Sequence, residues 1–423
     1  MKLSVSQVYT SIACNRTPEI VDWNSDGLIC YGGSNAVVIY DTKIKGKDPI
    51  TVLSHHRCRV NSVKWIRKPD GTSTELVSCS ADKTAAIWTL TDGVWKVTAT
   101  LQGHKDGVMC IHGTYHGDRL LVFTASIDST VKVWERSEDG STSLKHNIPL
   151  QSGLCLTLHG HILPIVGQPI LFCALDDHKI HVFTGEDFHR VHQMVGHEDW
   201  VTSDWIKHNL KPSFSDDSTI MLASCSQDTY IRLWRIQAHS SDEAIDISVE
   251  KKVFQAYEEQ WEVKLEAVLA GHEGWVYGVQ WHPPLVENGK RKVIHSLLSS
   301  SLDKSLIVWQ PEPSGAWVER VRLGEVGGSG LGFYGSRYGP GGEVLAHGYN
   351  GSFHIWSCCK NTLWPEQQKL YGHGYEVYAL AASADGALLA SACRATSVEH
   401  AALILWYAII IRPDPLVHNH HQT

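Results

Sequence analysis

Short apolar runs bounded by polar turn residues recur along the whole chain. Eight of these runs end in an aromatic residue: Tyr40, Trp88, Trp134, Phe183, Trp234, Trp309, Trp356 and Trp406. Successive members are 46 to 51 residues apart, except for one interval of 75 residues. Such runs predict buried β-strands, and a fixed period in the forties predicts a repeated four-stranded sheet.

A second pattern repeats at the same period. In the segment ELVSCSADKTAAIW a hydroxyl residue, an aspartate and a tryptophan follow an upstream histidine, and this set recurs three more times. The four sets are His56, Ser78, Asp82 and Trp88; His104, Thr124, Asp128 and Trp134; His197, Ser224, Asp228 and Trp234; and His272, Ser299, Asp303 and Trp309. The period and the sets together resemble WD-repeat β-propeller blades.

The resemblance implies a structural role for the four sets. In WD-repeat blades the indole donates to the hydroxyl, the hydroxyl to the imidazole and the imidazole to the carboxylate, so that each buried polar group is paired. Serine, histidine and aspartate could also form a catalytic triad. A triad occurs once, however, whereas this set recurs four times and always with tryptophan. We therefore interpret these residues as structural and expect no catalytic residue in them.

The aromatic ends also predict the domain organisation. Seven of them, up to Trp356, predict an all-β, seven-bladed propeller over residues 1–357, with residues 3–13 supplying the strand that closes it. The long interval predicts an insertion at about 236–262. After a linker at 358–369 we expect an orphan eighth WD-like blade at 370–406 and an irregular, unstructured tail at 407–423.

Composition narrows the classes of function. The net charge of −8 argues against a free-standing nucleic-acid binder. The 11 cysteines show neither metal-ligand spacing nor a disulfide framework, and we expect no metal and no cofactor. A Gly-rich phosphate loop, paired catalytic carboxylates and a Cys-x-x-Cys motif are missing from the sequence. No signal-peptide core and no membrane-spanning apolar run is found, so we expect a soluble intracellular protein with no membrane partner.

Several longer phrases are more specific than the repeat. The strings GEVGGSGLGFY (324–334), LWPEQQKLYGHGYE (363–376) and EAVLAGHEGWV (266–276) resemble the Elongator complex subunit 2 family. That family carries two seven-bladed propellers, so the resemblance implies a shortened form with most of the second propeller missing.

The resemblance also implies a function. It predicts a non-catalytic scaffold that docks the catalytic and large subunits of Elongator, in cytoplasm and nucleus. It thereby supports modification of the wobble uridine of transfer RNA, which the chain itself would contact at most indirectly. The alternative is an unrelated WD-repeat adaptor, such as a ubiquitin-ligase substrate receptor or a signalling scaffold.

Three residues are candidates for contact with partners. Arg59, Trp200 and Trp275 each follow a set histidine by three residues, at the point where the first strand of a blade opens on one face of the ring. Aromatic side chains are enriched among the residues that dominate protein interfaces. The alternative is that neighbouring loops cover these side chains.

Overall fold

The computed structural model describes most of the chain between residues 14 and 407. The described residues are 14–42, 51–68, 72–151, 153–208, 219–239, 252–283, 285–287, 290–323, 332–339, 343–348, 353–356, 377–382, 388–393 and 403–407. The chain divides into two compact units. The first is Met1–Glu325 with Leu331–Asn361, and the second is Val326–Gly330 with Thr362–Thr423.

The regular structure described is β-strand throughout. In the first unit the first four sheets contain four antiparallel strands each, in chain order. They are formed by β1 (Val21–Trp23), β2 (Leu28–Gly33), β3 (Ala36–Asp41) and β4 (Thr51–Ser54); β5 (Val60–Ile66), β6 (Glu75–Ser80), β7 (Thr84–Thr91) and β8 (Val94–Gln102); β9 (Val108–His116), β10 (Arg119–Ser126), β11 (Thr130–Arg136) and β12 (Thr142–Pro149); and β13 (Cys155–Ile162), β14 (Pro169–Leu175), β15 (Ile180–Thr184) and β16 (His189–Met194). Among the described residues, no helix is long and apolar enough to cross a membrane.

The remaining sheets of the first unit vary this plan. The fifth has five strands, the sixth four, and the seventh three in its described part, and a short hairpin, β23–β24, lies outside them. Their strands are β17 (Val201–His208), β18 (Ile220–Ser226), β19 (Ile231–Ala238), β20 (Lys252–Ala256) and β21 (Glu259–Leu269); β22 (Val276–Trp281), β25 (Leu297–Ser301), β26 (Leu306–Pro311) and β27 (Trp317–Leu323); β28 (Phe333–Tyr338), β29 (Val344–Gly348) and β30 (Phe353–Trp356); and the hairpin β23 (Leu285–Glu287) and β24 (Lys290–Lys292).

Burial explains why the strands differ in sequence. The second strands β6, β14 and β18 are buried along their whole length. Apart from Glu75 at the start of β6, they are continuous runs of apolar and small residues. The fourth strand β8 alternates between exposed and part-buried positions, because only one of its faces is covered. The apolar core therefore lies between neighbouring sheets. One cluster joins Phe172 of the fourth sheet to Leu222 and Trp261 of the fifth.

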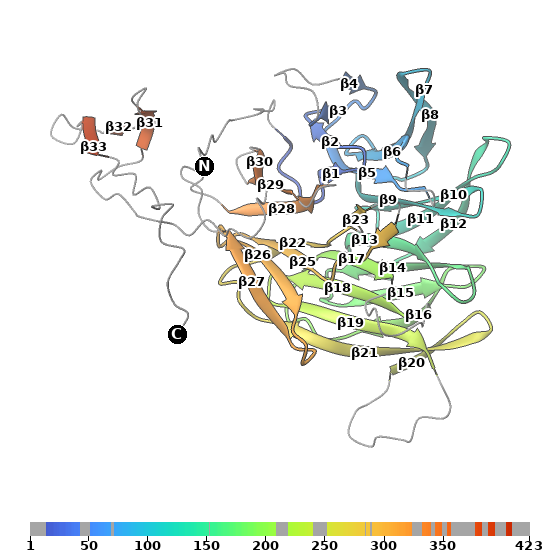
Figure 1. Cartoon of the computed structure of the whole chain (residues 1–423). Helices are drawn as coiled ribbons and strands as arrows, with labels where there is room; N and C mark the ends of the chain where they lie inside the picture. Colours follow the sequence, from blue (N-terminus) through green and yellow to red (C-terminus); the bar gives the residue numbers. More distant parts are fainter. Residues whose placement is uncertain are drawn as a thin grey trace. The chain divides into compact units, whose positions relative to one another are not determined.

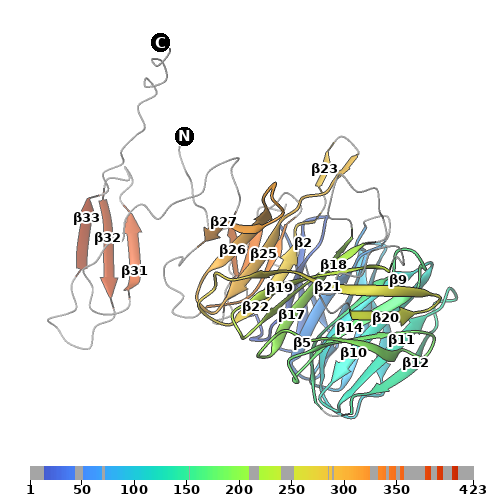
Figure 2. The ribbon, with the colours of Figure 1, turned by 90° about the horizontal axis from the view of Figure 1, so that it is seen from below.

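The sheets are arranged around one axis. The first strand of each sheet packs against the first strand of the next, from β5 through β9, β13, β17 and β22 to β28. Strand β1 contacts both β5 and β28, so the series of contacts returns to its start. Figure 1 shows the sheets following one another in chain order, and Figure 2 shows them side by side from a second direction. This radial arrangement of sheets is that of a β-propeller.

The fifth sheet contains part of the segment predicted as an insertion. β19 extends to Ala238, and β21 pairs with both β19 and β20, so residues 236–238 and 252–262 belong to the sheet. Phe254 and Trp261 are buried against the neighbouring fourth sheet. The many charges of this segment conceal these apolar positions in the sequence. Residues 240–251 lie outside the described part of the chain.

The second unit contains one described sheet. Its three strands, β31 (Val377–Ala382), β32 (Leu388–Cys393) and β33 (Leu403–Tyr407), are paired in chain order within the predicted orphan blade. The predicted closing strand at 3–13, the linker at 358–369 and residues 408–423 of the predicted tail lie outside the described residues. These parts of the domain organisation stay predictions.

Candidate functional site

Each set of four residues identified in the sequence is brought together inside one sheet. In the second sheet the Trp88 indole donates to Ser78 Oγ over 2.8 Å. Ser78 Oγ lies 2.8 Å from His56 Nε2, and His56 Nδ1 lies 3.3 Å from Asp82 Oδ2. Because the hydroxyl accepts from the indole, its own proton goes to the imidazole, which then donates to the carboxylate. The chain of bonds runs from the buried strand to one edge of the sheet. This edge, which we call the rim, carries the loop before the first strand and the turn between the second and third strands.

The other three sets repeat this geometry in the third, fifth and sixth sheets. The bonds from tryptophan to hydroxyl, from hydroxyl to histidine and from histidine to aspartate are 2.9, 2.8 and 3.1 Å for Trp134, Thr124, His104 and Asp128; 2.9, 2.8 and 2.8 Å for Trp234, Ser224, His197 and Asp228; and 2.9, 2.8 and 2.9 Å for Trp309, Ser299, His272 and Asp303. The fourth sheet, which has Phe183 in its third strand instead of tryptophan, contains a different bond that the sequence pattern did not reveal. There His181 Nε2 bonds Asp177 Oδ2 over 2.9 Å.

The aspartates also fix the loops at the rim. Asp82 Oδ2 accepts from the backbone N–H of Arg57 over 2.8 Å, and Asp82 Oδ1 accepts from Thr84 N–H over 3.0 Å. Burial raises the pKa of the Asp82 carboxyl, but the Thr84 hydroxyl and the Arg57 N–H outweigh burial and hold this pKa below its usual value. Burial lowers the pKa of His56. A neutral imidazole and an ionised carboxylate are therefore stable together near neutral pH.

The three candidate contact residues occupy equivalent positions on this rim. The carbonyl oxygen of each accepts an N–H from the turn between the second and third strands of its sheet: Ala81 to Arg59 at 2.9 Å, Gln227 to Trp200 at 3.0 Å and Leu302 to Trp275 at 2.9 Å. Trp200 is 45% and Trp275 47% exposed, and Arg59 is exposed as well. Neighbouring loops of the described chain thus leave all three side chains accessible.

Further aromatic residues on the rim were missed by the sequence argument. Tyr277 lies edge-on to Trp275 at 6.4 Å between ring centroids and to Tyr334 at 5.1 Å. The Gln227 side chain donates to the Tyr277 hydroxyl over 3.3 Å, which links the fifth and sixth sheets. Tyr230, in the turn that follows Asp228, is 40% exposed. The signal that could have found Tyr277 and Tyr334 is an aromatic residue at the second position of the first strand in successive repeats.

A buried ion cluster lies where the first strands meet. Glu19, just before β1, accepts a hydrogen bond from Ser203 Oγ of β17 over 2.9 Å and pairs with Lys64 of β5. Its other ion pair is with Arg337 of β28, at 3.2 Å between Oε2 and Nη2. One carboxylate thus joins the first, second, fifth and seventh sheets. Burial raises the pKa of Glu19, but Lys64 and Arg337 outweigh burial, and this pKa lies far below its usual range.

A second buried carboxylate reinforces this cluster. Asp22 lies 3.1 Å from Arg67 and 3.5 Å from Arg337, and it accepts from the Trp65 backbone N–H over 3.0 Å. Both carboxylates are thus held by cations of neighbouring sheets. Carboxylates with pKa values this low are weak bases, which suits ion pairing better than proton transfer.

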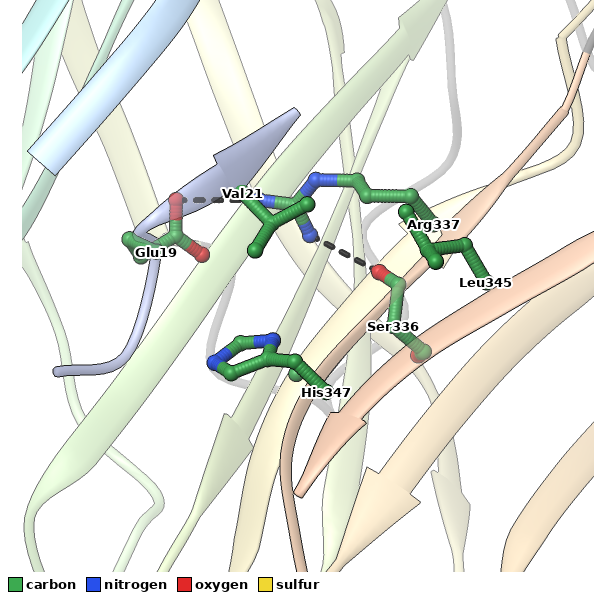
Figure 3. Close-up of a pocket in the computed structure, with 7 residues that line it drawn as sticks. Glu19, Val21, Ser336, Arg337, Leu345 and His347 are labelled. Carbon is green, nitrogen blue, oxygen red and sulfur yellow. Dashed lines mark hydrogen bonds and ion pairs between the residues drawn. The ribbon is translucent and has the colours of Figure 1, made fainter. Parts of the chain in front are cut away.

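A small cavity adjoins the cluster. It is lined by Glu19, Ser336, Arg337 and His347, together with the apolar Val21 and Leu345. Figure 3 shows the Arg337 guanidinium between the Glu19 carboxylate and the Ser336 backbone carbonyl, with His347 beneath them. Burial lowers the pKa of His347 to about 4, helped by the charge of Arg337. Within the described residues, no group of three or more His, Cys, Asp or Glu side chains is placed to hold a metal ion.

We expect Asp228→Ala to destabilise the protein and to cost more than Asp82→Ala. Losing a partner of a buried polar group costs about 1–3 kcal/mol in the free energy of unfolding. Asp228 also pairs with Arg232 at 2.7 Å, so its loss leaves a largely buried guanidinium without that partner. Urea unfolding at neutral pH measures both variants. Wild-type stability in either variant would contradict the structural role of the sets.

Acid should destabilise the protein through His347. The unfolded chain binds a proton at this residue below a pKa of about 6.5, whereas the folded protein does so only below about 4. The contribution of His347 to stability is therefore complete above a pH of about 6.5 and is lost as the pH falls toward about 4. His347→Gln should make the melting temperature fall less steeply on acidification than in the wild type.

The exposed His189 provides the control for this pH experiment. His189→Gln removes an imidazole whose side chain is 61% exposed and should keep the wild-type pH dependence. Equal slopes for His347→Gln and the wild type would show that His347 does not contribute to acid unfolding.

Known proteins share the repeat that these sets define. The sequence pattern of the WD domain, G-beta repeat family matches residues 47–89, 95–135, 188–235, 263–310 and 364–398. Each of the first four matches contains one of the four hydrogen-bonded sets, and the fifth match lies in the second unit. Together they cover about half of the chain.

Several proteins that are longer than this chain and similar to it share one name. The chain is 38% identical to Elongator complex protein 2 of Danio rerio over 378 residues, which cover 86% of the chain and 45% of that protein. It is 36% identical to Elongator complex protein 2 of Drosophila melanogaster, with 92% of the chain and 51% of the relative covered. The chain is 36% identical to Elongator complex protein 2 of Homo sapiens, with 84% of the chain and 44% of that relative covered. The chain thus spans about half the length of the curated relatives it matches. The repeats and the bonded sets within them place the chain in the WD domain, G-beta repeat family, alongside the relatives named Elongator complex protein 2.

Proposed function

We propose that this chain is a non-catalytic scaffold subunit of Elongator, which docks other subunits on its propeller. The observation that carries the proposal is the rim, where Trp200 and Trp275 stay 45% and 47% exposed at equivalent positions of neighbouring sheets. Large aromatic side chains on a rigid scaffold are the residues that most often dominate protein interfaces. The name shared by the relatives supports Elongator as the assembly.

The proposal includes a definite architecture. We infer that the first unit is a complete seven-bladed ring. The contacts of β1 with both β5 and β28, and the seven sheets found among the described residues of this unit, support the inference. The seventh sheet has three described strands, and residues 3–13 would supply its fourth. The sheet of β31, β32 and β33 would be a separate WD-like blade.

The role in the cell follows from the proposed assembly. Elongator modifies the wobble uridine of transfer RNA, and its catalytic subunit is a different chain. The present chain would support this reaction in cytoplasm and nucleus by holding other subunits, with at most indirect contact with transfer RNA. The recurrence of the His-Ser-Asp-Trp sets as buried hydrogen-bond chains supports a structural rather than an enzymatic role.

Affinity purification of the tagged full chain from cells, followed by mass spectrometry, tests this proposal. We expect the large and catalytic subunits of Elongator to co-purify with the wild type. The double variant Trp200→Ala with Trp275→Ala should reduce their recovery about tenfold or more, since truncating a central aromatic residue of an interface costs at least about 2 kcal/mol.

The matched control removes apolar side chains of similar exposure away from the rim. Leu265 and Val268, on β21, are 44% and 47% exposed, and replacing both with alanine should leave recovery unchanged. Equal losses in the two double variants would contradict docking on the rim. Recovery of ubiquitin-ligase or signalling components without Elongator subunits would instead support the unrelated WD-repeat adaptor.

A further inference from the structure

The exposed charges of the rim differ between its two sides. Cations predominate on one side, where Asp106 is an exposed carboxylate among them. Arg57, Lys83 and Lys105, together with the candidate Arg59, form what we call the basic arc, on the second and third sheets. All four side chains are exposed, and none forms an ion pair with another described residue. Lys83 Nζ donates to the carbonyl oxygen of Lys105 over 2.9 Å, so the arc is continuous across the two sheets.

The opposite side of the rim is aromatic. The aromatic arc consists of five side chains on the fifth, sixth and seventh sheets: Trp200, Tyr230, Trp275, Tyr277 and Tyr334. The position that follows the set histidine shows the change in charge. On the basic arc, this position is occupied by the cations Arg57 and Lys105. Beside the aromatic arc, it is occupied by the carboxylates Glu198 and Glu273.

Apolar residues connect the two arcs. Ile127 is 45% and Leu154 38% exposed, in the rim of the third and fourth sheets. A Cβ at Gly107 would lie 3.3 Å from the Cα of Ala81 and 3.6 Å from Cδ1 of Ile127, so the turns of the second and third sheets are in close contact. An extended chain that crosses the rim from Arg59 to Trp275 by this route would meet apolar surface between the arcs.

We propose that the rim binds an extended segment of a partner protein that is acidic at one end and apolar at the other. Its carboxylates would lie on the basic arc, and its aromatic or aliphatic side chains on the aromatic arc. Charge complementarity would fix the direction of the segment, because carboxylates placed on the aromatic arc would face Glu198 and Glu273. This inference rests on the proposed docking function and names the chemistry of the segment that would dock.

The charges favour a protein segment over RNA. Single-stranded nucleic acid is bound where cations follow the backbone beside the aromatic residues on which bases stack. Here the four exposed cations of the basic arc lie on one side. Beside the aromatic arc, Lys304 is only partly exposed and Arg232 is buried against the Tyr230 ring, whereas Glu198 and Glu273 are exposed and would repel phosphates. A polypeptide can separate its charged and apolar side chains in the way that this rim separates their binding surfaces.

Selection from a random library of displayed peptides about 16 residues long, with the full chain as bait, tests the inference. We expect the enriched peptides to combine net negative charge at one end with aromatic or aliphatic residues at the other. Replacing Arg57, Arg59, Lys83 and Lys105 together with glutamate should weaken binding of the best synthetic peptide about tenfold or more, given four lost rim contacts.

The matched control reverses as many charges elsewhere. Lys96, Lys145, Lys264 and Arg320 are exposed on strands β8, β12, β21 and β27, and replacing all four with glutamate alters the net charge equally. This variant should keep wild-type affinity. Thermal unfolding verifies that both quadruple variants are folded, and single reversals of Arg59 and Lys105 replace the rim variant if it is not.

Three outcomes would overturn the inference. They are enriched peptides with neutral or basic consensus, equal losses in the two quadruple variants, and binding of a mixed-sequence RNA of about 20 nucleotides that depends on the basic arc while the peptides do not bind. These outcomes leave the co-purification of Elongator subunits unaffected. Conversely, peptide selection that succeeds without such co-purification would contradict the proposed assembly and not the chemistry of the rim.

Discussion

The carboxylate of Glu19 is the point on which the ring of sheets depends. Glu19 lies just before β1 of the first sheet. Its carboxylate pairs with Lys64 of the second sheet and Arg337 of the seventh, and it accepts from Ser203 of the fifth. A buried charge is costly unless it is paired and fully hydrogen-bonded. Glu19 also has a φ of 66°, which is uncommon for a residue other than glycine. Its contacts to three other sheets stabilise this conformation, and they specify which sheets meet at the start of β1.

Two kinds of polar contact stabilise the ring, one within each sheet and one between sheets. The His-Ser-Asp-Trp sets act within a sheet, where aspartates such as Asp82 tie the loop before the first strand to the turn between the next two. The Glu19 cluster acts between sheets, through strands that are distant in sequence. The rim loops are therefore fixed in themselves and relative to one another. If Trp200 and Trp275 contact a partner as proposed, this rigidity would keep the cost in conformational entropy low.

The sequence predicted well what is repeated. The sheets and the hydrogen-bonded sets could be located because each repeat can be compared with the others. The Glu19 cluster could not be found in this way, since it occurs once and joins residues that are up to 318 positions apart. Phe254 and Trp261 were concealed for another reason, namely the charges that surround them in the sequence.

The role of Glu19 can be measured directly with the variant Glu19→Gln, which keeps the shape of the side chain and removes its charge. Native-state hydrogen exchange, resolved by mass spectrometry, reports the opening of individual strands. If Glu19 holds the sheets together, exchange in β1 and β28 should accelerate strongly, because breaking a buried ion pair costs about 3–5 kcal/mol. The outer strands β8 and β12, which Glu19 does not contact, should change much less. Wild-type protection of β1 and β28 in the variant would contradict the account.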